Sequence, residues 1–176
     1  TVGFIGGIRY LNQMKMLVDA AEQINIKVLF AGAGGTETDY KQILKYCEGK
    51  KDVIFTGKYD YGNEITKLYE SVDCVFAVYD ADNSNVRIAL PNKLYESVVC
   101  ELPLIVAKST YLSELVDKWD IGISINHTST DELMLALKKL RDDRLYYNKL
   151  CENCKKIKKK FDVRIYDSKL KEIIDA

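Results

Sequence analysis

The most constraining feature of the sequence is an alternation of short apolar runs with longer stretches of helical spacing. Six runs of four or five residues are mostly apolar, and in the stretches that separate them apolar side chains recur every three or four positions. Cys74–Val78 is apolar without interruption, which is typical of parallel strands that are buried on both faces. This alternation predicts a parallel sheet covered by helices on both sides.

The pattern also predicts where the elements lie. The expected strands are Val2–Ile5, Lys27–Ala31, Val53–Thr56, Cys74–Val78, Leu104–Ala107 and Gly122–Ile125. The expected helices are Gln13–Ile24, Thr38–Cys47, Asn63–Val72, Lys93–Cys100, Tyr111–Trp119 and Asp131–Leu140, with one or two more over residues 142–175. Thr130 is expected to cap the helix that follows it. The predicted fold class is therefore α/β: a Rossmann-like three-layer α/β/α sandwich with a mainly parallel six-stranded sheet.

Length and composition fit a single domain. The 176 residues are 47% hydrophobic, which allows a sizeable core. The 26 basic and 26 acidic side chains balance, which argues against a nucleic-acid partner. The five cysteines cannot all pair within the chain, so a reducing cytoplasm is the expected location. Because the chain begins inside a strand and without Met, we expect it to be part of a longer protein.

Two cations follow the first expected strand. Ligands of parallel sheets bind beyond the carboxyl ends of the strands, so the loops at these ends are where a site is expected. Gly6 and Gly7 allow the backbone to approach a ligand closely. Arg9 and Lys15 then lie near a helix N-terminus, a combination suited to a diphosphate. A turn followed by two solvated charges is the alternative.

The next two loops carry weaker signals. Residues 32–37 begin like a dinucleotide fingerprint, but Glu37 stands where its third glycine belongs. We therefore expect a tight turn near a ligand at Gly32 and no dinucleotide site. Tyr59 follows the third strand and is suited to packing against a nucleobase, with an ordinary surface tyrosine as the alternative.

The longest central loop, residues 79–90, leads into a helix that begins Pro91-Asn92-Lys93-Leu94-Tyr95-Glu96. The start of this helix offers free N–H groups to an anion, and Lys93 adds a full charge. Glu96 lies about one turn further along. A carboxylate beside phosphate-binding groups is chemically sensible when it binds something neutral, such as a ribose diol.

The stretch Pro91–Ala107 resembles the donor-site signature of group 1 glycosyltransferases with the GT-B fold, in which P-(N/S)-K-x-(Y/F)-E opens a helix and a Pro-hydrophobic-Ile strand follows. The resemblance extends from about Val2 to Ile125. It implies that Glu96 binds the ribose of a nucleotide sugar. It further implies a diphosphate site formed by Arg9, Lys15, Asn92 and Lys93, and ligand-lining loops that contain Gly7, Gly32, Tyr59 and Leu94. One departure is Ile88, which replaces the first Glu of the family's E-x7-E pattern, a residue that often contacts the donor sugar.

The resemblance implies that residues 1–176 are a C-terminal nucleotide-sugar-binding domain whose N-terminal acceptor domain lies outside this chain. The implied activity is transfer of a hexosyl group from a UDP- or GDP-sugar, with retention, to a saccharide or lipid-linked acceptor in polysaccharide or glycan biosynthesis. The isolated domain is expected to be inactive, and its parent's catalytic residues are unknown. In this family, cationic side chains and a helix dipole stabilise the negative charge of the leaving diphosphate, so no metal or cofactor is expected.

Other features of the sequence have different interpretations. Cys151 and Cys154 form a C-x-x-C without the second ligand pair that a zinc site needs, and a lone His127 is more often structural. Lysines within residues 155–160 favour a solvated helix end, with peripheral association at the inner face of a membrane as the alternative. A non-catalytic Rossmann-like module and a sugar-nucleotide epimerase-type GT-B protein also remain open. The broken glycine fingerprint argues against a nicotinamide-dependent oxidoreductase.

Overall fold

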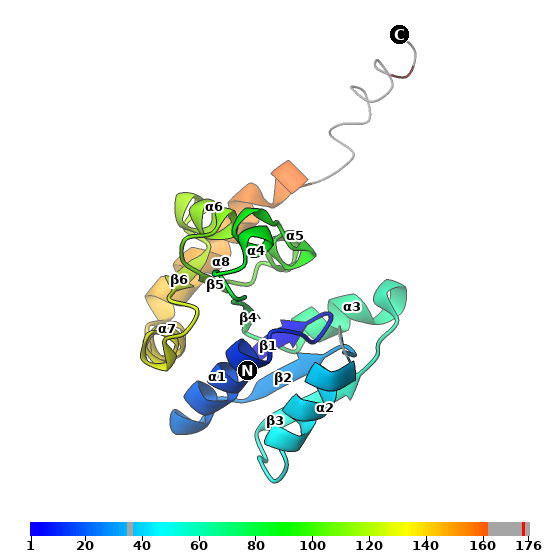
Figure 1. The fold of residues 1–176 in the computed structure, drawn as a ribbon. Coiled ribbons are helices and arrows are strands. Elements are labelled where there is room, and N and C mark those ends of the chain that lie inside the picture. The colour runs from blue at the N-terminus through cyan, green and yellow to red at the C-terminus, as the bar shows by residue number, and fades with distance from the viewer. Residues whose placement is uncertain (35–36, 162–173, 175–176) are drawn as a thin grey trace.

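A computed structural model shows a sheet enclosed between two layers of helices (Figure 1). It describes residues 1–34, 37–161 and 174. The strands are β1 (Val2–Ile5), β2 (Val28–Ala31), β3 (Val53–Gly57), β4 (Cys74–Ala77), β5 (Leu104–Ala107) and β6 (Gly122–Ile125). The helices are α1 (Leu11–Gln23), α2 (Glu37–Tyr46), α3 (Tyr61–Glu70), α4 (Ser84–Ile88), α5 (Asn92–Val99), α6 (Tyr111–Trp119), α7 (Thr130–Asp142) and α8 (Arg144–Lys158), followed by the 3₁₀ turn η1 (Lys159–Phe161).

The strands form one parallel sheet in the order β3-β2-β1-β4-β5-β6. The predicted α/β Rossmann-like class with a six-stranded parallel sheet is confirmed. The elements expected up to residue 140 agree with those observed to within two residues at each end. The expectation of further helices over residues 142–175 is met by α8 and η1 as far as residue 161, and residues 162–173 and 175 lie outside the described part.

Two local predictions were wrong. Residues 84–88 form the short helix α4 inside the stretch expected to be a loop, because the Asn83 side chain caps it by accepting a hydrogen bond from the Asn85 N–H at 2.9 Å. The N-cap of α7 is Ser129 and not Thr130. Ser129 has the extended backbone of a cap, and its Oγ accepts from the Glu132 N–H at 3.2 Å.

Successive side chains of each strand point to opposite faces of the sheet. On β4, Phe76 packs into the core beneath α1, α2 and α7, whereas Ala77 packs beneath α5 and α6. Helix α8 reaches both of these cores. Its Leu150 belongs to the first, and its Cys154 and Ile157 belong to the second. The second cysteine of the C-x-x-C is therefore a buried core residue.

The strand order reverses between β1 and β4. From β1 the chain proceeds to β2 and β3 on one side, and from β4 it proceeds to β5 and β6 on the other. In open parallel sheets the crevice at such a switch point, beyond the carboxyl ends of the strands, is where ligands bind. The loops that follow β1 and β4 therefore frame the candidate site.

The loop after β1 is held against the loop after β2 by a contact that only glycine permits. Gly32 has a φ of +132°, and a Cβ built on it would lie 2.1 Å from the Gly6 carbonyl oxygen. The Gly6 N–H donates to the Ala31 carbonyl at 2.8 Å, and the Ile8 N–H donates to the Ala33 carbonyl at 3.0 Å. Gly32, expected to lie near a ligand, thus supports the loop that carries Gly7.

We predict that Gly32→Ala destabilises the fold much more than Gly49→Ala. Both glycines have a positive φ, but a Cβ at Gly49 meets nothing within 4 Å, so that variant isolates backbone strain of about 1–2 kcal/mol. The Gly32 variant adds a clash with backbone, and we expect a loss at least about 2 kcal/mol larger. Urea unfolding of both variants provides the comparison, and equal losses would contradict the close approach.

Candidate functional site

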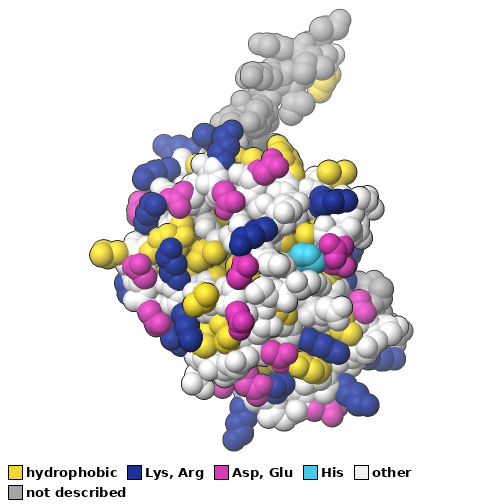
Figure 2. All heavy atoms as spheres, turned by 60° about the vertical axis from the view of Figure 1, so that its left-hand side comes forward, with side chains coloured by type: hydrophobic (Ala, Val, Ile, Leu, Met, Phe, Trp, Pro, Cys, Tyr) yellow, Lys and Arg dark blue, Asp and Glu magenta, His cyan; other side chains and the backbone are white. Residues whose placement is uncertain are grey.

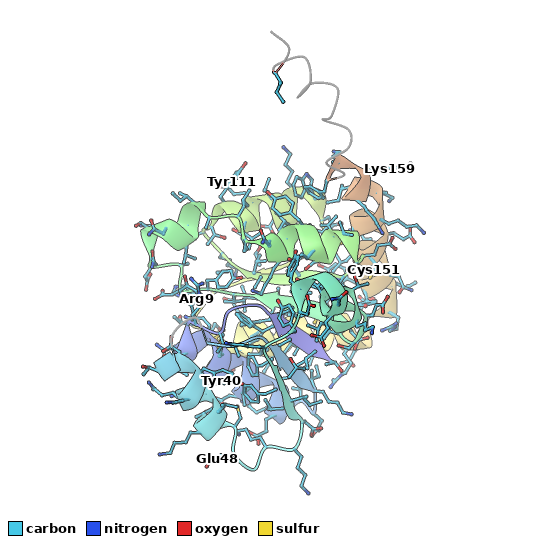
Figure 3. All side chains as sticks on the ribbon, turned by 90° about the vertical axis from the view of Figure 1, so that its right-hand side faces the viewer. Arg9, Tyr40, Glu48, Tyr111, Cys151 and Lys159 are labelled. Carbon is cyan, nitrogen blue, oxygen red and sulfur yellow. The ribbon has the colours of Figure 1, made fainter. Side chains whose placement is uncertain are left out.

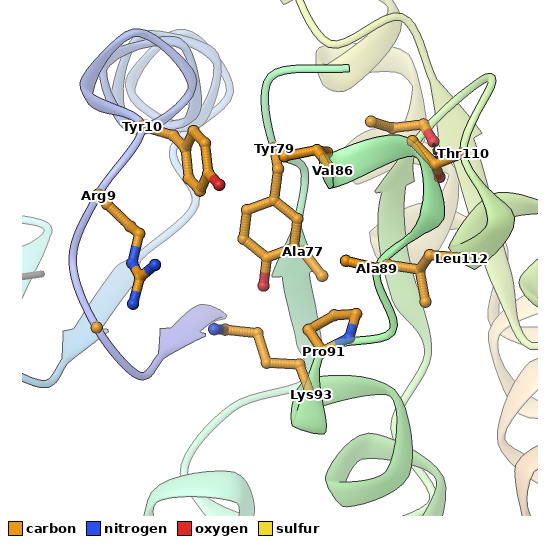
Figure 4. Close-up of a pocket in the computed structure, with 12 residues that line it drawn as sticks. Arg9, Tyr10, Ala77, Tyr79, Val86, Ala89, Pro91, Lys93, Thr110 and Leu112 are labelled. Carbon is orange, nitrogen blue, oxygen red and sulfur yellow. Dashed lines mark hydrogen bonds between the residues drawn. The ribbon is translucent and has the colours of Figure 1, made fainter. Parts of the chain in front are cut away.

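A cavity of about 250 Å³ opens at the carboxyl ends of β1 and β4 (Figure 4). Its walls come from the loops after β1, β4 and β5 and from the starts of α5 and α6. The lining residues are Gly7, Arg9, Tyr10, Ala77, Tyr79, Val86, Ala89, Pro91, Lys93, Ala107, Thr110 and Leu112. The cavity therefore lies at the switch point of the sheet.

Lys93 reaches this cavity from the first turn of α5, and its side chain is only 8% exposed. Its Nζ lies 4.3 Å from the ring centroid of Phe4 and 5.7 Å from that of Tyr79. A Cβ on Gly6 would lie 2.9 Å from this Nζ, so the ammonium rests against bare backbone. Among the described residues, it has no hydrogen-bond acceptor and no ion-pair partner, although buried charges are normally paired.

Burial lowers the pKa of Lys93 to about 8. The carboxylate of Glu96 acts in the opposite direction, and the guanidinium of Arg9 lowers the pKa further. Desolvation thus outweighs the one nearby negative charge. An anion beside Lys93 would restore the charged form, because an opposite charge at close range favours ionisation.

Arg9 supplies a second cation to the same cavity. It is exposed, and Figure 4 shows its guanidinium and the Lys93 ammonium directed into the space between the β1–α1 loop and α5. Figure 3 places Arg9 on the side of the molecule away from Cys151 and Lys159 of the C-terminal segment. Helix α1 begins beside Arg9, and its N-cap residue Tyr10 offers no side-chain cap. Two cations and a helix N-terminus at one place form an arrangement that binds anions.

Besides Gly32 and Tyr59, three further residues expected at the diphosphate or in the ligand loops lie outside this cavity. The Lys15 ammonium lies 5.0 Å from the ring centroid of Tyr46, over α2. The Leu94 side chain is completely buried in the core beneath α5 and α6. Asn92 is exposed at the first residue of α5 and is not part of the lining. The binding roles of all three stay predictions.

Glu96 is held by two tyrosines of α3. Its Oε2 accepts a hydrogen bond from the Tyr69 hydroxyl at 2.6 Å, and its Oε1 accepts one from the Tyr61 hydroxyl at 2.7 Å. Tyr69 is 1% exposed, whereas Tyr61 is 57% exposed. Burial and the bond to Glu96 raise the pKa of Tyr69, and the bond to Glu96 raises the pKa of Tyr61 to about 12. Both hydroxyls therefore stay protonated and fix the direction of the carboxylate.

Tyr59 lies within the electrostatic reach of the same carboxylate. Burial, followed by the negative charge of Glu96, raises the pKa of the Tyr59 hydroxyl. The three tyrosines and Glu96 therefore form a polar group between α3 and α5, on the α3 side of Lys93. From the sequence, Tyr59 was expected to contact the nucleobase and Glu96 the ribose. The sequence did not indicate that Tyr61 and Tyr69 are the hydrogen-bond partners of Glu96. Tyr69 lies within the apolar stripe of its helix, which indicates burial. A buried tyrosine hydroxyl needs a hydrogen-bond partner, so this position was the available signal for Tyr69.

His127, the only histidine, lies beside two aspartates on the surface (Figure 2). Its Nδ1 is 3.6 Å from Asp80 Oδ1, and its Nε2 is 3.8 Å from Asp82 Oδ1. Each ring nitrogen thus faces a different carboxylate at more than hydrogen-bond distance, and the buried Nδ1 has no hydrogen-bond partner among the described residues. The contact joins the loops after β4 and β6. Sequence reasoning found no carboxylate partner for His127 because these aspartates lie far away in the chain.

Comparison with known proteins identifies the family. The model of the glycosyl transferases group 1 family matches residues 1–161. The chain belongs to this family. The recognition made from Pro91–Ala107 is confirmed. No curated protein matches the chain significantly in sequence. Among the described helices, none combines the length and the apolar character required to cross a membrane.

Solved structures share the fold at low sequence identity. HepE from Anabaena in complex with UDP-glucose aligns over 99% of this chain and 48% of its own, with 20% identity and a TM-score of 0.81. Sucrose-phosphate synthase from Thermosynechococcus elongatus aligns over 99% of this chain and 44% of its own, with 15% identity and a TM-score of 0.78. The C-terminal domain of a group 1 family protein from Francisella tularensis, LpcC, aligns over 87% of this chain and 80% of its own, with 18% identity and a TM-score of 0.68. The chain thus spans about half the length of the first two.

We predict that Tyr69→Phe lowers the free energy of unfolding by about 1–2 kcal/mol, because it removes a buried hydrogen bond to a charged acceptor. Tyr61→Phe is the matched control. It removes the equivalent bond at an exposed position, and we expect a loss within about 0.5 kcal/mol. Chemical denaturation measures both losses. A Tyr61 loss as large as that of Tyr69 would show that burial does not distinguish the two bonds.

Proposed function

We propose that this chain is the donor-binding domain of a glycosyl transferase. The loop of Gly6 and Gly7, together with Arg9 and Lys93, binds the diphosphate of a nucleotide sugar, and Glu96 binds its ribose. The observation that carries this proposal is the buried ammonium of Lys93, which has no anionic partner of its own in the described chain and shares its cavity with Arg9. Such a site attracts a compact anion, and a diphosphate matches two converging cations.

The arrangement also fits the chemistry of glycosyl transfer. The bond between the sugar and the diphosphate breaks as negative charge develops on the leaving diphosphate. Arg9 and Lys93 would stabilise that charge in place, which is the role that a metal ion plays in other enzymes. This supports a reaction that needs neither a metal nor another cofactor. The complex of HepE with UDP-glucose supports a UDP-sugar as the donor of this chain, and a GDP-sugar is the alternative.

A second domain would complete the enzyme. Because the chain spans about half of HepE and of sucrose-phosphate synthase, we propose an N-terminal partner domain that supplies the acceptor site. The parent protein would transfer a hexosyl group, with retention, to a saccharide or lipid-linked acceptor in polysaccharide or glycan biosynthesis. Its expected place is the cytoplasm, with the lysines of α8 and η1 on a solvated helix end; association of these lysines with anionic lipid at the inner face of the membrane is the alternative.

We predict that UDP or GDP affinity falls as the pH rises above about 8. The free protein then loses the Lys93 proton that diphosphate binding requires, so affinity falls by up to about tenfold per pH unit until the pKa of the complex is reached. Lys93→Met should bind weakly with a flat profile from pH 7 to 9.5. Calorimetric or NMR titration measures the profile, with Lys67→Met on α3 as the control.

Lys15→Met in the same series tests whether Lys15, the third cation expected at the diphosphate, contributes to binding. A wild-type profile as flat as that of Lys93→Met would contradict the diphosphate role.

We predict that Glu96→Gln weakens UDP binding about tenfold but changes 2′-deoxy-UDP binding much less. The carboxylate accepts from ribose hydroxyls, so its contribution shrinks when one hydroxyl is absent. Val99→Thr, at an exposed position on the same helix, is the control. NMR titration with both nucleotides measures the four affinities. Equal losses for the two nucleotides would place Glu96 away from the ribose 2′ position.

A further inference from the structure

The order of groups along the site indicates where a donor sugar lies. Glu96 and its tyrosine partners lie on the α3 side of Lys93. The cavity extends from Lys93 in the other direction, to α4 and the start of α6. In a nucleotide sugar the diphosphate joins the ribose to the sugar. With the diphosphate at Arg9 and Lys93 and the ribose at Glu96, the sugar enters the cavity.

The two ends of the cavity differ in chemistry. In Figure 4, Arg9, Tyr10 and Lys93 lie at one end, and Tyr79 separates them from the other. The far end is lined by the side chains of Ala77, Val86, Ala89, Ala107, Thr110 and Leu112. Apart from the Thr110 hydroxyl, these side chains end in methyl groups. We refer to these six residues as the apolar end.

Four polar groups within the apolar end already have hydrogen-bond partners in the fold. The Thr110 hydroxyl donates to the Ala107 carbonyl at 2.8 Å and accepts from the Ser113 N–H at 3.1 Å. The Thr110 N–H donates to Ser113 Oγ at 3.2 Å, and the Ala89 N–H donates to the Asn85 carbonyl at 3.0 Å. Ile88, next to Ala89, is 75% exposed and adds no polar side chain. A sugar hydroxyl placed against these side chains would lose water without gaining an equivalent partner.

We propose that the donor sugar of this chain carries a methyl group that lies in the apolar end. This is either the methyl group of a 6-deoxy sugar or the methyl group of an N-acetyl substituent. The proposal rests on the proposed function, because it assigns the substrate class of the same site. A methyl group there exchanges water for contact with carbon, whereas a hydroxyl loses its hydration. A 6-deoxy sugar would be selected because it lacks a hydroxyl group, and an N-acetylated sugar because a methyl group ends its polar substituent. Neither would be selected by additional hydrogen bonds.

The test uses two matched pairs of donors and the full chain. GDP-mannose is compared with GDP-6-deoxymannose, and UDP-glucose is compared with UDP-N-acetylglucosamine, each relative to GDP or UDP alone. In one pair we expect the methyl-bearing donor to bind about tenfold more tightly than its partner. That pair identifies which methyl group the apolar end receives. Equal or weaker binding of both methyl-bearing donors would overturn the proposal.

Variants locate the preference in the cavity. Val86→Thr keeps the shape of the side chain but adds a hydroxyl, and should reduce the preference at least about threefold without changing affinity for GDP or UDP. Ala89→Ser, at an exposed position, repeats the test if Val86→Thr unfolds, and Val99→Thr is the control outside the cavity. A preference that survives both substitutions would also overturn the proposal. Failure of GDP and UDP themselves to bind would instead refute the proposed function, and this proposal with it.

Discussion

The structure depends on the close approach of one buried ammonium to bare backbone. Lys93 reaches Gly6 because no side chain stands in its way, and Gly6 is held there because Gly32 packs directly against its carbonyl. The rings of Phe4 and Tyr79 surround the charge, and their faces partly replace the water it has lost. Two glycines from different loops thus create a place for a cation at the point where the strand order reverses.

Keeping this charge buried lowers the stability of the free protein. The folded-state pKa of Lys93 is about 8, whereas an unfolded lysine titrates near 10.4, so between these values the unfolded chain binds more protons. The unfavourable contribution is complete below about pH 8, where it is on the order of 3 kcal/mol, and it disappears as the pH rises above about 10.4. An anion bound at the site would remove much of it. The burial that suits Lys93 to the proposed anion site thus lowers the stability of the free protein.

The sequence predicted the sheet well because each strand is a short, mostly apolar run, and such runs alternating with helical stretches are typical of a parallel sheet covered by helices. It assigned binding roles to Arg9, Lys93 and Glu96 from their places after strands and at a helix start. The structure brings Arg9 and Lys93 to one cavity, and the binding roles stay predictions. It missed α4, because five residues are too short to show a helical period. It also missed the bond between Tyr69 and Glu96, which depends on how α3 packs against α5 and not on any local pattern. Distant pairings of this kind are decided by tertiary packing.

Helix α8 has a consequence for how the chain is made. Its Leu150 completes the core on one face of the sheet, and its Cys154 and Ile157 complete the core on the other. During synthesis, the first core therefore stays incomplete until residue 150 has left the ribosome, and the second until residue 157 has. We therefore expect the domain to fold as one unit, late in synthesis. A chain released before this helix would expose apolar surface on both faces at once.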